Sequence, residues 1–545
     1  MIRRKFLQGS LLAATHWAAG GKAFGNESPT GGADAFGPII QTTAGKVRGY
    51  VADGVYKFKG IPYGAPAGGK ARFLPPNPPP SWTGVRNTLT YGAMAMQGPA
   101  IEGYYAAVLR GLNAESPKNT SEDCLHLNVW SPELGTGHNR PVMVWLHPGA
   151  FNGWRGDSEW TDGTHLARNH DVLMVSLNHR LTAFGFLYLG DLSSDYAESG
   201  NVGMLDVVAA LSWIQQNIAA FGGDPNNITI FGESGGGAKV ATLLAMPPAS
   251  GLFHKAIIES DVSIQGLTLE RALEVRGRIA RKLGIEMPTV EKFSEVPAAA
   301  LVEAQRDEAF APVVVAGSSL PHDPFFPDAP QVSSRVPILL GTNRTEAEYN
   351  LLADGLPTIA TDDALQKYVE AHARRLGAEQ VSKLVNLYHE FYPSESRETQ
   401  LVAVLTGLWR DRAQLAAELK VKQAQAPVFM YEFDWDAPGF EHRLHACHTF
   451  EIPFAFDNVD AAPQLFGAKP DARRFELARR MSSAWAAFAH NGNPSHRNLP
   501  EWKPYDLDNR STMMFGYSCK VVKDPWRAER LALEQFRPKM PSKPG

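Results

Sequence analysis

Cysteine, net charge and long apolar runs are all scarce in this chain of 545 residues, and each scarcity excludes a class of protein. The three cysteines, Cys124, Cys447 and Cys519, allow at most one disulfide, so a scaffold held together by several disulfides is excluded. No apolar run reaches the about 18 residues of a transmembrane helix, and we expect no stable membrane insertion. The net charge of -4 gives no reason to expect a nucleic-acid partner.

The first residues differ from the rest of the chain. They read MIRRKFLQGSLLAATHWAAGGKA, with twin arginines at Arg3 and Arg4, a short apolar region and small residues near Ala23. This pattern is typical of a twin-arginine export signal, which we place at residues 1–23 in preference to a disordered basic start. It predicts a periplasmic or secreted location and the twin-arginine translocation machinery as a partner during export. The few cysteines fit that route, which carries proteins already folded in a reducing cytosol, and we expect no structural disulfide.

The remainder, residues 24–545, has neither an internal repeat nor a low-complexity linker from about Gly45 onward, and we interpret it as one catalytic domain with long insertions. With 44% hydrophobic residues it has enough apolar mass for a large core. Short apolar runs alternate with longer helical ones such as residues 204–221. Strand–helix alternation over this length predicts an α/β fold with a large, mostly parallel central sheet flanked by helices. The runs that we expect to be buried strands are residues 172–177, 228–231, 256–260, 336–341 and 428–433.

The run Gly232-Glu233-Ser234-Gly235-Gly236 has the G-x-S-x-G pattern of a nucleophilic serine. Alone the pattern is weak, and the alternative interpretation is a glycine-rich connection. Here, however, a predicted strand precedes it and an alanine-rich helix follows. A sharp strand–turn–helix presents the serine hydroxyl at the end of a sheet, which makes Ser234 the candidate nucleophile.

A serine hydroxyl needs a base, and the base needs a group that orients it. In this architecture the chain order is serine, acid, histidine. Glu346 follows a predicted strand, with Glu348 as a rival. Further along, three histidines are available as the base: His442, His445 and His448. Their spacing also suits a metal site, but no H-E-x-x-H accompanies them, and we expect no metal.

Many ordered segments between Lys46 and Tyr505 resemble one known family. They include FKGIPYGAP, SEDCLHLNVW, NHRLTAFGFL, GNVGMLDVVAALSWIQQNIAAFGGDPNNITIFGESGG, GTNRTEAE and WAAFAHNGNP. On these segments the chain resembles the type-B carboxylesterases, the cholinesterase-like branch of the α/β-hydrolases, and within them the bacterial para-nitrobenzyl esterases. The resemblance implies an α/β-hydrolase fold and an esterase activity that needs no cofactor.

The resemblance also implies roles for individual residues. The family's G-E-S-x-G places the nucleophile on Ser234, its G-x-N-x-x-E selects Glu346, and its H-x-x-E-[IL]-x-[FY]-x-F selects His448. The family's oxyanion-hole motif H-G-G-G-F falls on His147-Pro148-Gly149-Ala150-Phe151, and the implied donors are the N–H groups of Gly149, Ala150 and Gly235. Pro148 falls on the glycine that does not donate, so its missing N–H costs nothing directly. A second departure is Ala95, which stands where the family has the cysteine that pairs with Cys124.

The sequence therefore predicts an exported serine carboxylesterase that cleaves small-molecule esters through an acyl-enzyme. The alternatives are a non-catalytic interaction module of the same family, and an amidase or thioesterase on the same three residues. Glu233, beside the nucleophile, either tunes the electrostatics or is simply a buried, paired carboxylate. The substrate stays open. The aromatic residues that we consider for the lining of a substrate gorge are Phe151, Trp154, Trp160, Phe325, Phe326 and Tyr349.

Overall fold

The computed structural model describes residues 37–98, 103–112, 119–355, 357–373, 375–467 and 471–538. The predicted export signal, residues 1–23, lies outside these ranges. The described residues from Pro38 onward belong to one compact unit. No helix in the described ranges is long and apolar enough to span a membrane.

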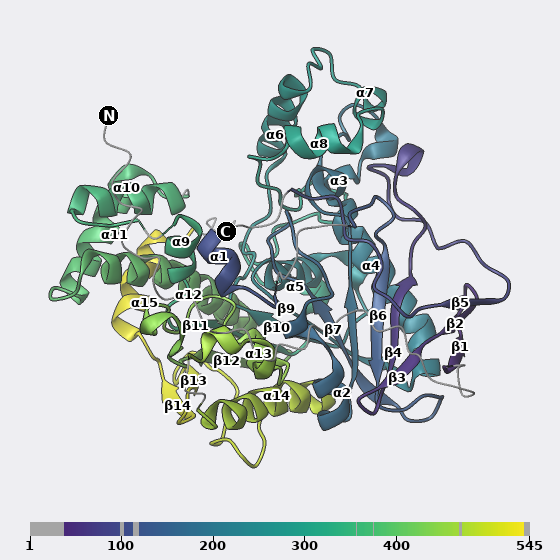
Figure 1. The fold of residues 1–545 in the computed structure, drawn as a ribbon. Coiled ribbons are helices and arrows are strands. Elements are labelled where there is room, and N and C mark those ends of the chain that lie inside the picture. The colour runs from purple at the N-terminus through teal and green to yellow at the C-terminus, as the bar shows by residue number, and fades with distance from the viewer. Residues whose placement is uncertain are drawn as a thin grey trace, which may run out of the picture. The chain divides into compact units, whose positions relative to one another are not determined.

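The five predicted strands lie in one large sheet, which has 11 strands in the described part of the chain (Figure 1). Neighbouring strands from β8 to β13 are parallel, and the strands outside this block pair antiparallel. This confirms the predicted mostly parallel sheet. In spatial order the strands are β14 (Lys520–Lys523), β13 (Ser511–Phe515), β12 (Val428–Phe433), β11 (Ile338–Asn343), β10 (Lys255–Glu259), β9 (Gly223–Glu233), β7 (Arg140–Leu146), β8 (Leu173–Leu177), β6 (His126–Ser131), β4 (Val55–Pro62) and β3 (Tyr50–Ala52). A small separate sheet contains β1 (Ile39–Gln41), β2 (Lys46–Arg48) and β5 (Val85–Asn87).

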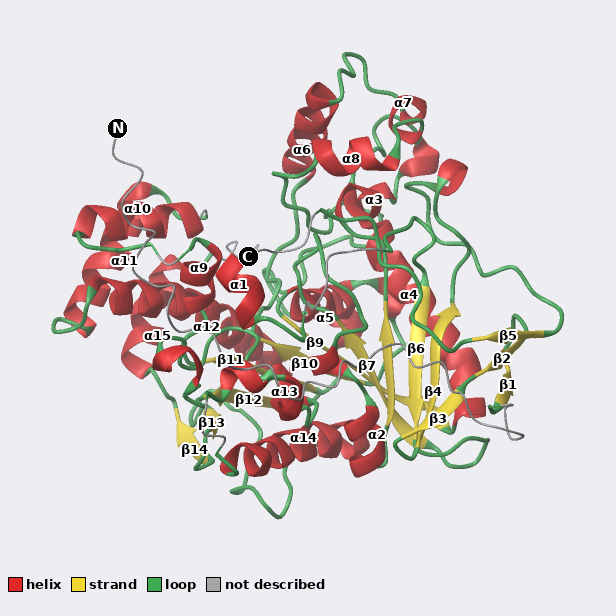
Figure 2. Cartoon of the chain, in the orientation of Figure 1, coloured by secondary structure: helices red, strands yellow, loops and turns green. Residues whose placement is uncertain are grey.

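Helices cover both faces of the large sheet, as the red and yellow elements of Figure 2 show. Strand β7 illustrates why both faces are apolar. Val142 and Val144 belong to the core cluster that includes α4 and α5, whereas Met143 and Trp145 belong to the cluster that includes α2 and α14. Side chains alternate along a strand, so a strand with apolar residues at every position is buried on both faces. The helices are α1 (Gly103–Val108), α2 (Thr164–His170), α3 (Thr182–Phe186), α4 (Val202–Asn217), α5 (Gly235–Ala245), α6 (Leu269–Lys282), α7 (Val290–Ser294), α8 (Ala298–Ala304), α9 (Glu348–Ala353), α10 (Asp362–His372), α11 (Ala378–Phe391), α12 (Arg397–Gln423), α13 (Ile452–Ala455), α14 (Arg473–Asn491) and α15 (Arg527–Leu533).

Two helical excursions interrupt the strand–helix alternation. One contains α6, α7 and α8 and joins β10 to β11; the other contains α9, α10, α11 and α12 and joins β11 to β12 (Figure 1). The second has its own apolar cluster, in which residues of α10, α11 and α12 pack together. Among their described residues, these excursions add no strand to the sheet.

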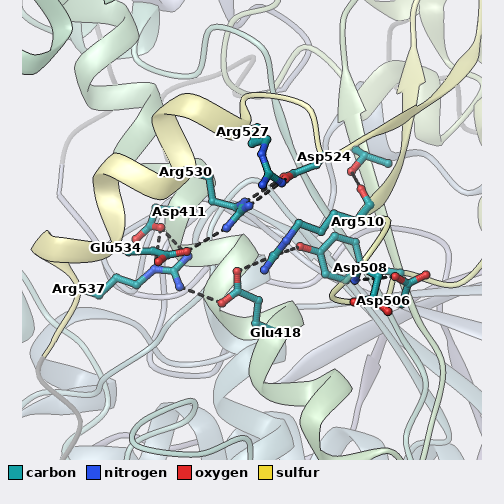
Figure 3. Close-up of polar contacts among 12 residues, drawn as sticks. Asp411, Glu418, Asp506, Asp508, Arg510, Asp524, Arg527, Arg530, Glu534 and Arg537 are labelled. Atoms are coloured by element: carbon teal, nitrogen blue, oxygen red, sulfur yellow. Dashed lines mark hydrogen bonds and ion pairs between the residues drawn. The ribbon is translucent and has the colours of Figure 1, made fainter.

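Ion pairs tie the C-terminal segment to α12 (Figure 3). Glu418 of α12 accepts hydrogen bonds from Arg510 at 2.7 Å and from Arg537 at 2.9 Å. Arg537 also donates to Asp411 at 2.8 Å, and Arg530 of α15 donates to Asp524 at 2.9 and 2.8 Å. The segment that follows α15 is therefore held at Arg537 to the same long helix that runs past the site described below.

The sheet brings the motif loops to one edge. Leu146, the last residue of β7, lies beside Gly232 of β9, and Glu259, the last residue of β10, lies beside both Glu233 of β9 and Gly341 of β11. The carboxyl ends of parallel strands meet at one edge, where α/β proteins build their sites. The segments that follow β7, β9 and β11 therefore start close together.

Candidate active site

Ser234 lies between the end of β9 at Glu233 and the start of α5 at Gly235. Its backbone angles are φ 55° and ψ -122°, a conformation that residues with a side chain rarely adopt. Its N–H donates to the carbonyl of Glu259 at 2.9 Å, which anchors the turn to the neighbouring strand. Ser234 is partly exposed, whereas Glu233 and Gly235 on either side are buried. The predicted sharp strand–turn–helix is therefore present, with Ser234 partly exposed at the turn.

The segment His147–Phe151, which we call the oxyanion loop, follows β7 and lies against the start of α5. Gly149 and Ala150 both have left-handed backbones, with φ 89° and 51°. A Cβ placed on Gly235 would lie 2.2 Å from the nitrogen of Ala150, so the two backbones approach as closely as glycine allows. Within the described residues, the N–H groups of Gly149, Ala150 and Gly235 donate to no protein acceptor. The structure thus places the three predicted donors together with their N–H groups available.

Glu346 and His448 are brought together although about a hundred residues separate them in sequence. Thr345 forms a parallel bridge with Cys447, and its N–H donates to the carbonyl of Ala446 at 3.2 Å. Nδ1 of His448 donates to Oε2 of Glu346 at 2.7 Å. Because Nδ1 is engaged in this way, Nε2 is the ring nitrogen left to accept a proton.

The rival residues lie apart from this pair. Glu348 begins α9 and accepts a hydrogen bond from Oγ1 of Thr345 at 3.2 Å. His445 is partly exposed and is hydrogen-bonded to Asp436 at 2.7 Å. Neither contacts the Glu346–His448 pair through a hydrogen bond in the described residues. The geometry therefore favours Glu346 over Glu348 and His448 over His445.

Burial shifts the titration of the pair. His448 and Glu346 are both removed from water. Burial lowers the pKa of the His448 imidazole from its ordinary value of 6.5, and burial raises the pKa of the Glu346 carboxyl. The lowered pKa of the imidazole favours its neutral form. The imidazole is therefore neutral near physiological pH, which is the form that can accept a proton from a hydroxyl.

Three further glutamates are buried around the pair: Glu233, Glu259 and Glu451. Burial raises the pKa of each carboxyl, and their mutual proximity raises the pKa of Glu233 further. Glu451 accepts hydrogen bonds from Oγ of Ser260 at 2.8 Å and from Nδ2 of Asn343 at 2.5 Å. Glu233 has one carboxylate oxygen 3.2 Å from Nδ1 of His448. Glu233 is therefore buried and within reach of the pair, and its influence on the electrostatics of the site stays a prediction.

Aromatic rings pack against His448 from two elements. Tyr349 of α9 and Trp409 of α12 meet the imidazole edge to face, with centroid separations of 5.0 and 4.6 Å. Tyr349 was among the aromatic residues considered from the sequence. Of the others, Trp160 and Phe325 are fully buried in the core, and Phe151 packs against Phe186.

The sequence reasoning missed Trp409 and its neighbour Arg412. Arg412 lies 3.3 Å from Asp261, the residue after Ser260. Nothing in the composition of α12 distinguishes the face that meets His448, because most of this long helix is buried.

A nucleophile turn at the end of a parallel strand, an acid–histidine pair from later strands and a loop of free N–H groups define an α/β-hydrolase. Comparison with known proteins makes the assignment narrower. A model of the carboxylesterase family matches residues 37–533. The chain belongs to the carboxylesterase family and is a carboxylic ester hydrolase.

Individual relatives agree with this assignment. The chain is 35% identical over 508 residues to the para-nitrobenzyl esterase of Bacillus subtilis (strain 168), an alignment that covers 91% of this chain and 98% of the relative. It is 33% identical to the human cocaine esterase, with 88% of each chain covered. Among solved structures, the Geobacillus stearothermophilus carboxylesterase EST55 superposes with a TM-score of 0.79 at 35% identity, covering 91% of this chain and 99% of that one. These findings confirm the family and fold predicted from the sequence.

Proposed function

We propose that this protein is an exported serine carboxylesterase that hydrolyses small esters through an acyl-enzyme on Ser234. The hydrogen bond from Nδ1 of His448 to Glu346 carries the proposal, because it leaves Nε2 as the base for the serine hydroxyl. Nε2 takes the hydroxyl proton while Oγ attacks the ester carbonyl. The proton then passes to the departing alcohol, and water repeats the sequence to release the acid.

The oxyanion loop would supply the electrostatic part of catalysis. Attack moves negative charge onto the carbonyl oxygen, and fixed N–H donors stabilise that charge without having to reorganise. The proximity of Ala150 to Gly235 and the available N–H groups of Gly149, Ala150 and Gly235 support this role. Glu346 stays hydrogen-bonded throughout and stabilises the imidazolium that forms.

The substrate class follows from the surroundings of His448. Tyr349 and Trp409 present aromatic surface to the imidazole, and aromatic surface favours apolar, flat groups on a substrate. The names of two relatives, para-nitrobenzyl esterase and cocaine esterase, refer to esters that contain aromatic groups. We propose neutral esters with an aromatic alcohol or acyl group as substrates.

Replacing Ser234 by alanine tests the catalytic proposal. Ser234→Ala should abolish turnover of an aromatic ester and leave the thermal unfolding midpoint close to that of the wild type. Ester turnover that survives in this variant would contradict the assignment. Parallel assays with the matched thioester and amide separate esterase from thioesterase and amidase activity, and wild-type protein without any turnover would favour the interaction-module alternative.

The export proposal needs its own test. It rests on Arg3, Arg4 and the apolar region that follows, since the translocation receptor reads the arginine pair. Changing Arg3 and Arg4 together to lysine should leave the full-length protein in the cytoplasm of a host with this pathway. Export that continues unchanged would point to another route.

A further inference from the structure

A single charged residue lies inside the helix that follows Ser234. Every residue of α5 is buried, and Lys239, the charged one, is 0 % exposed. An ammonium group is costly to remove from water unless strong acceptors surround it. Because Lys239 lies about one turn after Ser234, the acceptors of its ammonium group determine what it contributes to the site.

Both hydrogen bonds of the ammonium group end on the oxyanion loop. Nζ of Lys239 donates to the carbonyl of His147 at 3.0 Å and to the carbonyl of Ala150 at 2.6 Å. It also lies 5.3 Å from the ring centroid of Phe151, within range of a cation–π interaction. Lys239 thus contacts the oxyanion loop at its first, fourth and fifth residues.

The remaining carbonyls of the loop are also engaged. The carbonyl of Pro148 accepts a hydrogen bond from Nδ1 of His147 at 2.8 Å, and that of Gly149 accepts from Asn152 and Gly153, each at 3.1 Å. In a planar trans peptide, holding the carbonyl on one side directs the N–H to the other side. The carbonyls of Pro148 and Gly149 belong to the peptide groups that carry the N–H groups of Gly149 and Ala150, so the hydrogen bonds just described hold these two peptides. Lys239 holds the peptide before them through the carbonyl of His147 and the peptide after them through the carbonyl of Ala150.

This support matters because the loop is unfavourable on its own. Ala150 has φ 51°, a left-handed conformation that a residue with a Cβ adopts only where its surroundings impose it. The hydrogen bond from Lys239 to the Ala150 carbonyl is charge-assisted, the stronger kind of hydrogen bond. The same charge adds to the positive potential where the ester oxygen would become negative.

We propose that Lys239 is a positioning residue of the oxyanion hole, whose ammonium group clamps both ends of the loop His147–Phe151 so that its N–H groups face the reacting carbonyl. The inference rests on the proposed function, because it presumes that the loop stabilises the oxyanion. Lys239 touches neither substrate nor nucleophile; it acts through the loop.

The charge state of Lys239 adds a pH dependence to this role. The titratable groups that face it are His147 after β7, His179 after β8 and Glu233 at the end of β9. Burial lowers the pKa of Lys239 to about 7, opposed by the charge of Glu233, and burial keeps the two histidines neutral by lowering their pKa values. As pH rises through the pKa of Lys239, its charge-assisted bonds become ordinary ones, and the loop is held less firmly.

Lys239→Met tests the proposal, since methionine fills similar volume without a charge or a donor. We expect kcat for a small ester to fall about 10- to 100-fold with KM changed less than about threefold, as displaced catalytic groups elsewhere cost similar factors. Affinity for butylboronic acid, which forms a tetrahedral adduct with the serine, should fall in parallel with kcat. Lys239→Arg, which keeps charge and donors, should restore part of kcat.

Lys420 offers a matched control. It is also buried, and its Nζ donates to two main-chain carbonyls, those of Ser333 at 2.6 Å and Ser334 at 2.9 Å, in a loop outside the site. Lys420→Met should lower the thermal midpoint as Lys239→Met does, but leave kcat and the affinity for butylboronic acid unchanged. A loss of kcat equal in both variants would assign the effect to stability and overturn the proposal.

The remaining outcomes separate this inference from the proposed function. A folded Lys239→Met variant with kcat within about twofold of wild type, while Ser234→Ala is inactive, overturns the role of Lys239 and leaves the proposed function intact. An active Ser234→Ala variant overturns the proposed function itself. If Lys239→Met does not fold, the wild-type profile decides: kcat should decline by about three- to tenfold above neutral pH, and a flat profile up to about pH 10 contradicts the clamp.

Discussion

Ser234 stores backbone strain at the point where chemistry is proposed. Its φ of 55° and ψ of -122° persist because the N–H is bonded to Glu259 and the next residue is a glycine pressed against Ala150. An unfavourable backbone conformation of this kind persists only where the surrounding contacts hold it in place. The sheet, the turn and the oxyanion loop together therefore fix the direction of one hydroxyl.

The titration of His448 predicts the acid side of the pH profile. Burial lowers its pKa below 6.5, so the neutral, proton-accepting imidazole stays populated in mildly acidic solution and is lost as pH falls through the lowered value. We predict that kcat/KM for a neutral ester, measured between about pH 4 and 7, falls with an apparent pKa below 6.5. A midpoint clearly above 6.5 would contradict this account of the buried pair.

The two acids after β11 should differ in their effect on catalysis. Glu346→Gln removes the carboxylate that holds Nδ1 of His448, and turnover should fall by about four orders of magnitude, as it does when the orienting acid of a serine protease triad is neutralised. Glu348→Gln is the matched control, since Glu348 accepts a hydrogen bond from Thr345 and lies 3.9 Å from His445, without a hydrogen bond to His448 in the described residues. Steady-state kinetics of both variants decide the matter, and greater damage from Glu348→Gln would show that the acid is misassigned.

The oxyanion loop allows a test of a single N–H group. Proline at position 150 is unsuitable, because its ring cannot adopt the φ of 51° found there. Replacing Ala150 by lactic acid, its α-hydroxy analogue, exchanges the N–H for an oxygen and keeps the side chain. Turnover should fall about 100- to 1,000-fold. Pro148→Gly serves as the control, because it removes no donor, and we expect a loss of about tenfold or less; near-normal turnover of the lactate variant would mean that this loop is not the oxyanion hole.

At the scale of elements, α12 connects the site with the C-terminal segment. Trp409 packs on His448 near the middle of this helix, and Glu418, further along, binds Arg510 and Arg537 (Figure 3). Because α12 is held by the contacts of Trp409 and of Glu418, the Trp409 ring stays in position against the His448 imidazole. The long excursion between β11 and β12 therefore contributes to the site as well as to the core.

Removing the anchor on α12 should destabilise the protein. Glu418→Ala leaves two largely buried guanidinium groups without this partner, and breaking buried pairs of this kind costs about 3–5 kcal/mol. The free energy of unfolding, measured by urea titration, should fall by roughly this amount. Glu379→Ala removes one member of an exposed pair with Lys383 and should leave the urea midpoint unchanged. Equal effects of both substitutions would show that the network does not stabilise the C-terminal segment.

Periodicity and turn chemistry predict the elements of this fold well. The strand predicted at residues 172–177 is β8, and the one at 428–433 is β12 with the same ends. The strand predicted at 228–231 begins earlier, at Gly223, because the residues that form a turn after α4 also pair with Arg140. Local residue preferences indicate where an apolar strand lies, but pairing with a distant partner sets where it begins.

At the scale of the whole molecule, the parts of the site that the sequence did not reveal come from distant pairings. Motifs predict Ser234, Glu346 and His448 as the catalytic residues, but Trp409 reaches His448 only through the packing of α12 over the sheet edge. Lys239 likewise looks like an ordinary helical lysine, because burial of all of α5 depends on the sheet and its covering helices. Sequence motifs reveal residues that react and that recur at fixed spacings. The residues that hold them in place, such as Trp409 and Lys239, depend on tertiary contacts that a local sequence pattern does not contain.

The most direct test of the central claim is to identify the serine that reacts with a fluorophosphonate probe. The wild-type protein should incorporate one probe molecule, and peptide mapping by mass spectrometry should place it on Ser234, because only an activated hydroxyl reacts quickly. Ser260 is the informative comparison, since it is buried and bonded to Glu451 close to the same histidine. Label on Ser234 alone, absent from Ser234→Ala, is the result that this account predicts; label on Ser260 with Ser234 unmodified would contradict it.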